Sequence, residues 1–295
     1  MRVFVTGATG NIGSAVVEDL IAAGHQVLGL CRSEQKAGAL AAAGADVYRG
    51  SLEDEASLTR GAAQADGVIH LAFNHDFSRF AANCEDDRRV IKALGAGLAG
   101  TARPLVVTSG TALARAAPGQ LAKESDPILS SSMNPRAASE EAAAALAAEG
   151  LNVSVVRLPQ VHDPVSQGLI TPAIAMFREK GLCAYIGEGR NRWAAGPRLD
   201  VARLYRLAIE RAEPNARYHA VAEEGVSMRD IVEAVGTRIG LPVKSLTPAE
   251  APAFFGWLAL FAGHDMPASG AWTQEILGWK PTGPSLISDL EKLPL

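Results

Sequence analysis

The sequence predicts an α/β fold, with a doubly wound parallel sheet and a smaller lobe at the C-terminal end. The main observation is that six short apolar runs alternate with amphipathic stretches, starting at the N-terminus. The runs contain few polar residues, which is typical of parallel strands covered on both faces. Strands are expected at residues 3–5, 27–30, 46–48, 67–71, 105–108 and 153–157, and helices at 12–23, 35–42, 54–62, 80–98 and 140–148.

After about Pro164 this alternation loosens. Helices are expected near 170–180, 201–211 and 228–239, with a strand near 183–186, and proline and glycine punctuate the last 60 residues. Residues 1–164 are therefore predicted to form the main domain, with a sheet completed by parts of 183–221. Residues 165–295 are predicted to form mainly the smaller lobe, which would bind substrate.

Composition excludes several classes of function. The chain has 295 residues, 48% of them hydrophobic, and a net charge of −4, so the basic excess of a general nucleic-acid binder is missing. Three widely spaced cysteines (Cys31, Cys84 and Cys183) favour reduced thiols over a disulfide framework or a zinc site. The longest apolar stretch, Phe254 to Ala262, is too short to span a bilayer. We expect a cytoplasmic protein without a signal peptide, membrane segment or metal site.

A glycine-rich turn follows the first predicted strand. It reads Thr6–Gly7–Ala8–Thr9–Gly10–Asn11–Ile12–Gly13. Gly7 permits a sharp turn, Gly10 lets the backbone approach a pyrophosphate, and Gly13 allows close packing of helix and strand. The alternative is an ordinary glycine-rich turn, but the strand before it and the helix after it favour a dinucleotide site. The predicted cofactor contacts here are Gly7, Thr9, Gly10, Asn11 and Ile12.

The end of the second predicted strand indicates which dinucleotide is bound. An acidic residue there would hold the ribose 2′-hydroxyl of NAD, but the sequence is Leu30–Cys31–Arg32–Ser33. The planar fork of Arg32 suits a 2′-phosphate, and Ser33 adds a hydroxyl. Such a charged hydrogen bond would favour NADP(H) roughly 10- to 100-fold. The alternative is that Arg32 is a solvated surface arginine.

Several motifs together resemble the short-chain dehydrogenase/reductase superfamily, on its extended or atypical side. Besides the glycine turn, they are Gly50–Ser51–Leu52–Glu53–Asp54, His70–Leu71–Ala72, the segment from Arg157 to Pro164, Leu199–Asp200–Val201–Ala202 and Leu277–Gly278–Trp279–Lys280–Pro281. The resemblance covers most of the chain and implies a Rossmann-type NADP-binding domain at 1–164. It adds the cofactor contacts Ser51, Leu52, Leu71, Ala72, Phe73, Pro159 and Val161.

The chain departs from this family in its chemistry. The family's usual proton donor is a tyrosine, with a lysine four residues on and a serine nearby. None of the four tyrosines of this chain has a lysine at that spacing. Arg136 and Glu140 align with the tyrosine and the lysine, and Gly110 aligns with the serine. The usual mechanism therefore cannot be carried over, and the chain resembles an atypical member.

Other side chains are candidates for the missing roles. Thr111 and Ser109 could hydrogen-bond a substrate oxygen, and His162 could transfer a proton near the nicotinamide. His75, Arg136 and Trp193 are predicted to line the substrate site. Each has a structural alternative: a hydroxyl capping the chain, a structurally bonded histidine, a surface helix start, or an exposed turn. The aromatic stretch 254–262 is either core or a lid or oligomer contact.

The predicted function is that of an NADP(H)-dependent oxidoreductase, which transfers a hydride to a carbonyl or imine of a small apolar molecule. The loss of the tyrosine–lysine pair keeps a second hypothesis open, a catalytically silent NADP(H)-binding redox sensor. A nucleotide-sugar epimerase or dehydratase is a third, against which the missing pair and the short C-terminal lobe argue. A small molecule is the expected partner, and a homodimer is compatible with the sequence.

Overall fold

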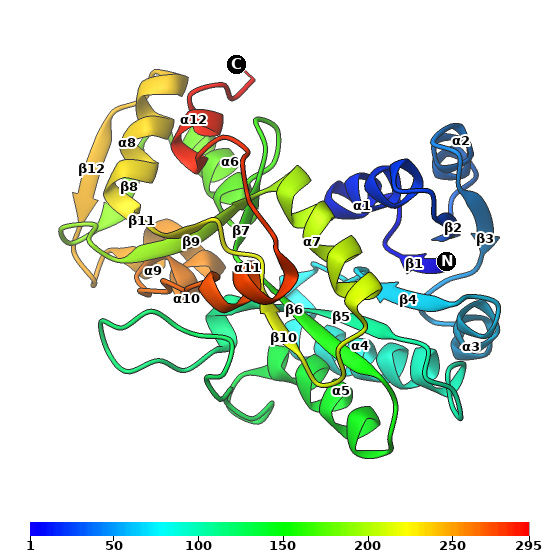
Figure 1. Cartoon of the computed structure of the whole chain (residues 1–295). Coiled ribbons are helices and arrows are strands. Elements are labelled where there is room, and N and C mark those ends of the chain that lie inside the picture. Colours follow the sequence, from blue (N-terminus) through cyan, green and yellow to red (C-terminus); the bar gives the residue numbers. More distant parts are fainter. Residues whose placement is uncertain (295) are drawn as a thin grey trace.

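Seven parallel strands form the central sheet, in the order β10-β6-β5-β4-β1-β2-β3 (Figure 1). The computed structural model describes residues 1–294. The strands are β1 (Arg2–Thr6), β2 (Gln26–Cys31), β3 (Asp46–Arg49), β4 (Gly67–His70), β5 (Leu105–Gly110), β6 (Val153–Leu158) and β10 (Arg217–His219). This confirms the predicted fold class, and the apolar strands are buried as a parallel sheet requires.

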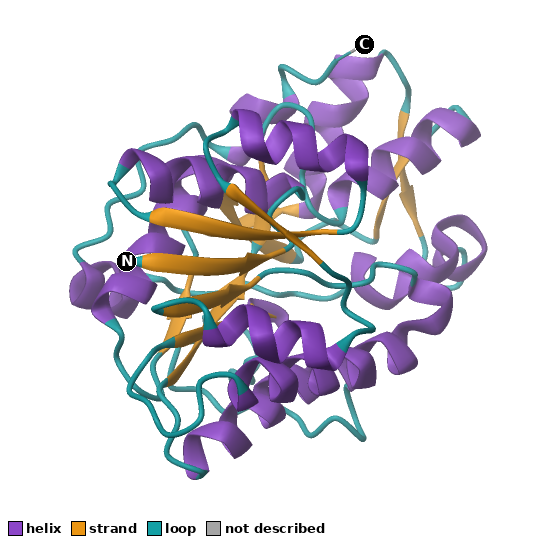
Figure 2. Ribbon diagram, turned by 90° about the vertical axis from the view of Figure 1, so that its right-hand side faces the viewer, coloured by secondary structure: helices purple, strands orange, loops and turns teal. Residues whose placement is uncertain are grey.

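Helices cover both faces of this sheet (Figure 2). One face packs against α1 (Asn11–Ala22), α2 (Glu34–Ala42) and α7 (Arg198–Arg211). The other packs against α3 (Glu55–Ala63), α4 (Phe80–Ala96) and α5 (Ala138–Ala148). The buried apolar residues of these helices are mainly alanine, valine and leucine, and they face the strands, as expected of amphipathic crossover helices.

The strand order reverses between β1 and β4. From β1 the chain builds β2 and β3 on one side, and then crosses over to build β4, β5 and β6 on the other. In register, Thr6 at the end of β1 lies beside His70 at the end of β4. Ligands of open parallel sheets bind at the carboxyl ends of the strands, at this kind of switch point. A ligand-binding site is therefore expected at the edge that contains Thr6 and His70.

The C-terminal lobe has two small sheets. One holds β7 (Gln160–His162), β9 (Arg192–Pro197) and β11 (Glu223–Ser227), and the other holds β8 (Cys183–Ile186) and β12 (Val243–Leu246). The lobe's own core lies among these sheets and its helices. These helices are α6 (Ile170–Lys180), α8 (Met228–Ile239), α9 (Ala251–Phe255), α10 (Ala259–Ala262) and α12 (Leu286–Leu290), whereas α11 (Ala271–Leu277) packs on α7 and β10 of the main domain.

The predicted elements up to residue 164 are present, with ends shifted by a few residues. Of the segment 183–221, only β10 joins the central sheet, because β8 and β9 pair within the lobe. The sequence did not indicate β7, β9, β11, β12 or the short helices α9–α12. Within residues 1–294, no helix has both the length and the apolar character needed to cross a bilayer.

Candidate cofactor and active site

The glycine turn between β1 and α1 has the backbone geometry that its sequence predicted. Gly7 has φ of +70°, and a Cβ added there would lie 2.8 Å from the backbone nitrogen of Ala72. A Cβ on Gly13 would lie 2.0 Å from the carbonyl oxygen of Gly7, so only glycine lets the helix come this close to the turn. Gly10 caps α1 without a side-chain hydrogen bond and is exposed together with Asn11. The first turn of α1 is thus open to an anion.

A hollow of about 350 Å³ lies where β2 and β3 end. Arg32 and Arg49 both line it, and Cys31 is the register partner of Arg49. Arg49 forms an ion pair with Glu34 at 2.5 Å, whereas Arg32 is 74% exposed and lies 4.0 Å from Glu53. The remaining lining residues are Cys31, Gly50, Ser51 and Asp54. The hollow therefore combines two guanidinium groups with the predicted contact Ser51.

The remaining predicted cofactor contacts lie along the same strand ends. Half-buried residues there are Thr9, Ile12, Ser33, Leu52, Leu71, Ala72, Phe73 and Pro159. Val161 is different, because its side chain is 5% exposed and packs in the core beneath the sheet edge. The prediction that this side chain contacts the cofactor therefore has no support in the geometry.

A buried polar chain joins the ends of β1 and β4 to α4. The hydroxyl oxygen of Thr6 accepts hydrogen bonds from the backbone N–H groups of Leu71 and Ala72, so its own proton points to His70 Nδ1, 2.6 Å away. His70 Nε2 then carries the imidazole proton and donates it to Asp87 Oδ1 at 2.9 Å. The chain continues from Asp87 to Ser139 and Arg136.

The carboxyl group of Asp87 is stabilised in its ionised form within this hydrogen-bond network. Burial by itself raises the pKa of its carboxyl group, but the opposing effects of His70, Arg136 and Ser139 outweigh burial, and the pKa is lowered. An ionised Asp87 pairs with the Arg136 guanidinium at 3.1 Å, so two buried or half-buried charges compensate each other. No motif in the sequence indicated Asp87 or the role of His70.

Arg136 lies at the end of this hydrogen-bond network, near the candidate site and just before α5. Its guanidinium donates to the carbonyl oxygen of Thr108 at 3.0 Å and stacks on the ring of Phe73, with 4.3 Å between the guanidinium carbon and the ring centroid. Phe73 belongs to the predicted cofactor-lining segment after β4. Arg136, which the sequence aligns with the family's tyrosine, therefore lies beside that segment.

Comparison with known proteins decides the family. The family described as NAD(P)H-binding matches residues 7–177, which include the glycine turn and the strand ends described above. The chain belongs to the NAD(P)H-binding short-chain dehydrogenase/reductase family. An uncharacterized protein of Schizosaccharomyces pombe is 45% identical over 98% of both chains.

Named relatives of this family are more distant. A UDP-glucose 4-epimerase of Streptomyces lividans is 29% identical over 98% of this chain and 94% of its own. Among solved structures, a dTDP-glucose 4,6-dehydratase from Streptomyces venezuelae with NAD bound has a TM-score of 0.78 and 20% identity, over 99% of this chain and 95% of that one. At that identity the structure establishes a shared fold.

Glu140, which the sequence aligns with the family's lysine, is part of a buried ion pair. Glu140 is buried and accepts two hydrogen bonds of 2.8 Å from Arg157, which is itself fully buried. The same carboxylate accepts the hydroxyl proton of Ser109 at 2.7 Å. Ser109 is 4% exposed and already donates its proton, so the predicted catalytic role of Ser109 has no geometric support.

Two further predicted site residues lie inside the C-terminal lobe. His162 is fully buried on β7 and contacts Asp289 of α12 at 2.8 Å, so its imidazole belongs to the core of the lobe and is closed to solvent. Trp193 is 2% exposed in the core, and its indole donates to the carbonyl oxygen of His264. The predictions of a proton-transferring His162 and a substrate-lining Trp193 are therefore corrected.

Thr111 and His75 remain at the site end of the sheet. Thr111 follows β5, is 5% exposed and donates a long 3.4 Å hydrogen bond to the carbonyl oxygen of Leu158, so its hydroxyl is as buried as that of Ser109 and its predicted catalytic role is untested. His75 lies in the exposed loop after β4, next to the rings of Phe73 and Phe77. Desolvation by these neighbours and the charge of Arg136 lower the pKa of His75. Its imidazole is therefore neutral at neutral pH.

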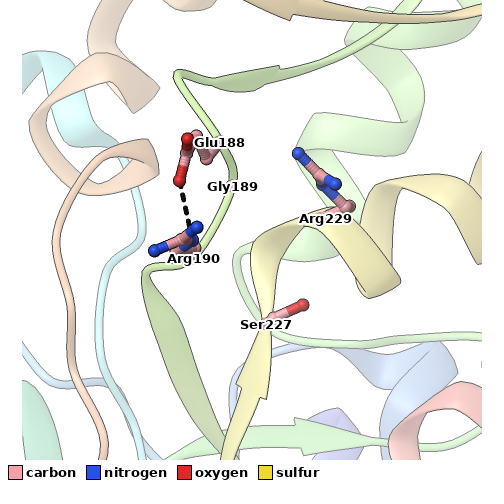
Figure 3. A pocket seen from close by; sticks show the side chains of 5 residues that line it. All are labelled: Glu188, Gly189, Arg190, Ser227 and Arg229. Carbon is pink, nitrogen blue, oxygen red and sulfur yellow. Dashed lines mark ion pairs between the residues drawn. The ribbon is translucent and has the colours of Figure 1, made fainter.

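A second hollow lies in the C-terminal lobe, between the loop after β8 and the start of α8 (Figure 3). Its two arginines are already engaged. Arg190 forms an ion pair with Glu188 at 2.7 Å, and Arg229 lies over the ring of Tyr185. None of the predicted site residues lines this hollow. We assign it no part in the function.

Proposed function

We propose that the protein is an NADP(H)-dependent oxidoreductase that transfers a hydride to the carbonyl or imine carbon of a small apolar substrate. The observation that carries this proposal is the hollow at the ends of β2 and β3, which Arg32 and Arg49 share. When bound, NADPH would supply the hydride, and the residues of the protein would bind the cofactor and orient it toward the substrate. The turn around Gly7 and Gly13 would hold the pyrophosphate.

The charges of the hollow favour a phosphorylated ribose. Arg32 and Arg49 are paired with Glu53 and Glu34, which are 74% and 90% exposed. Exposed ion pairs of this kind contribute little, so exchanging the carboxylates for a phosphate costs little. A phosphate carries more charge than a carboxylate and accepts forked hydrogen bonds from a guanidinium. These residues support NADP(H) over NAD(H), although the dehydratase structure holds NAD.

A redox sensor is the second candidate function. The observation that favours it is that Glu140, which aligns with the family's lysine, pairs with the buried Arg157, while Ser109, the neighbour of the aligned Gly110, donates its hydroxyl proton to Glu140. The related epimerase suggests a sugar nucleotide as substrate, but Arg136 and Glu140 replace the tyrosine and lysine that such chemistry uses in the family.

The free, buried Cys31, Cys84 and Cys183 fit the reducing cytoplasm in which we place the protein.

One experiment separates these functions. The binding of NADPH and NADH is measured by titration calorimetry, and NADPH oxidation is followed against ketones, aldehydes and cyclic imines. Turnover with NADPH supports the oxidoreductase. Tight NADPH binding with no turnover across the panel would favour the sensor. Equal affinity for NADH would remove the role assigned to Arg32 and Arg49.

A further inference from the structure

Arg136 keeps unused hydrogen-bond donors at the site end of the sheet. A guanidinium has five N–H groups. In the described residues, three of them are engaged, by Asp87, Ser139 and the carbonyl oxygen of Thr108. The side chain remains 17% exposed. Two N–H groups are therefore left for a ligand.

These donors are held in place before any ligand arrives. The ring of Phe73 lies under the guanidinium carbon, and Asp87 holds one end of the guanidinium by an ion pair. Asp87 is in turn held by His70, which Thr6 locks into one tautomer. Donors that are oriented in advance stabilise a developing negative charge without having to reorganise.

A strip of aromatic rings runs from Arg136 to the C-terminal lobe. We call Phe73, His75, Phe77 and Trp257 the aromatic strip. The ring centroids of Phe73 and His75 lie 5.3 Å apart, those of His75 and Phe77 6.3 Å, and those of Phe77 and Trp257 4.4 Å in a stacked pair. The rings of Phe73 and His75, and those of His75 and Phe77, meet edge to face, and Trp257 covers one face of Phe77. The outward ring surface is therefore that of His75, which is exposed, and of Trp257, which is 39% exposed. An aromatic ligand can pack against such rings edge to face or stacked.

The described side chains at this end include no strong proton donor. A guanidinium is a poor proton donor, Ser109 already donates its proton to Glu140, and burial and the charge of Arg136 lower the pKa of His75. A simple ketone would become a strongly basic alkoxide, which needs such a donor. A conjugated carbonyl compound becomes an enolate or phenolate instead, whose charge is delocalised and can wait for a proton from water.

We infer that Arg136 binds the oxyanion of the substrate, and that the substrate is a flat conjugated carbonyl compound, such as an aryl enone or a quinone, lying on the aromatic strip. This inference rests on the proposed NADP(H)-dependent function. In the step, a hydride with its electron pair bonds to an electron-poor carbon, and the displaced π pair moves to oxygen. Water then protonates the anion, so that substrate, NADPH and one proton give reduced substrate and NADP⁺.

The first test uses binding alone, with 4-nitrophenol as the probe, because its phenolate and phenol forms absorb differently. We expect the protein to bind the phenolate preferentially, which lowers the apparent pKa of the probe. Arg136→Gln should weaken phenolate binding about tenfold or more, the value of a charged hydrogen bond. Arg229→Gln is the matched control, since Arg229 also stacks on a ring but lies elsewhere. Equal phenolate binding by wild type and Arg136→Gln would overturn the inference.

A second variant tests the inference if Arg136→Gln does not fold. Trp257→Ala removes one ring at the exposed end of the strip and should weaken probe binding several-fold. Trp272→Ala is its control, because Trp272 is 42% exposed and stacks on Tyr218 outside the strip. If both tryptophan variants bind the probe like wild type, the strip is not a binding surface and the inference fails.

Turnover separates this inference from the proposed function. Matched pairs of aryl enones and their saturated ketones are compared with NADPH, and the enones should show the higher kcat/KM. If saturated ketones are reduced equally well, the conjugated substrate class is wrong while the oxidoreductase function stands. If no compound is reduced although NADPH and 4-nitrophenol both bind, the proposed function and the substrate class both fail.

Discussion

The hydroxyl oxygen of Thr6 lies 2.6 Å from Nδ1 of His70, across the two strands between which the sheet order reverses. This contact fixes the proton of His70 on Nε2, which then faces Asp87. The carboxylate in turn positions Arg136 beside Phe73. A contact within the sheet thus sets the orientation of a charged group at the site.

Removing the charge of Asp87 should destabilise the fold. Asp87→Asn leaves the half-buried Arg136 without its counter-ion, and breaking a buried pair in this way costs about 3 kcal/mol. Urea unfolding measures the change. Asp86→Asn is the control, because Asp86 pairs with Arg89 on the exposed side of α4 and should change stability by less than about 0.5 kcal/mol. Equal effects of the two substitutions would contradict the buried chain.

Asp87 should also make stability depend on pH in the acid range. Its pKa is lowered in the folded state, so as pH falls the unfolded chain takes up the proton first. The contribution of Asp87 is complete above the unfolded pKa of about 4 and is lost as pH falls through the folded pKa. Urea midpoints between neutral pH and pH ~3 test this. Asp87→Asn should show a shallower loss, and an unchanged slope would refute the assignment.

Arg32 and Arg49 should contribute to NADPH affinity but not to NADH affinity. Arg32→Ala is expected to weaken NADPH binding roughly 10- to 100-fold, and Arg49→Ala by about tenfold, because each removes a charged hydrogen bond to the 2′-phosphate. Calorimetric titration with both cofactors measures this. Arg211→Ala is the control, as Arg211 pairs with Glu213 away from the hollow. A parallel loss of NADH affinity would mean that the arginines support the fold instead.

Gly13 should not tolerate a methyl group. In Gly13→Ala the new Cβ would meet the Gly7 carbonyl oxygen at 2.0 Å, so the turn must move and dinucleotide binding should be lost. Gly38→Ala is the matched control, because Gly38 lies in α2 with open space around it. It should raise stability by about 0.5–1 kcal/mol. Thermal unfolding and NADPH titration of both variants check this. NADPH binding by Gly13→Ala at wild-type affinity would be incompatible with this geometry.

The sheet and the glycine turn could be predicted because short-range patterns determine them. The apolar runs have strand length, and Gly7 to Gly13 form one contiguous motif. The strands β7, β11 and β12 have 3, 5 and 4 residues and depend on partners far along the chain, so the sequence showed no clear period there.

The site was harder to predict because its contacts are tertiary. Asp87 stands beside Asp86 in an amphipathic helix, and only the packing of α4 shows which of the two faces inward. The burial of the polar His162 side chain is explained by its hydrogen bond to Asp289, which lies 127 residues away in the sequence. Arg49 could have been found, because the predicted third strand ends beside the second, and charged residues at neighbouring strand ends meet at one edge.

Restoring the family's lysine should damage this protein. Glu140 is the counter-ion of the fully buried Arg157 and also accepts a hydrogen bond from Ser109. Glu140→Lys would place two cations together in the core, where an uncompensated charge costs 3–5 kcal/mol or so. Even together with Arg136→Tyr, the result should be an unstable chain and not an enzyme with the usual tyrosine–lysine pair. Urea unfolding of Glu140→Lys measures this.

Glu149→Lys is the control for that substitution. Glu149 is exposed at the C-terminal end of α5, where a cation interacts favourably with the helix dipole, so stability should change by less than about 0.5 kcal/mol. A stable, folded Glu140→Lys protein would show that Arg157 has another way to be neutralised. The nearest other side chain is His219, whose Nε2 lies 3.3 Å from the Arg157 guanidinium, but an imidazole is either neutral or cationic and cannot compensate a cation. We therefore expect the lysine variant to unfold.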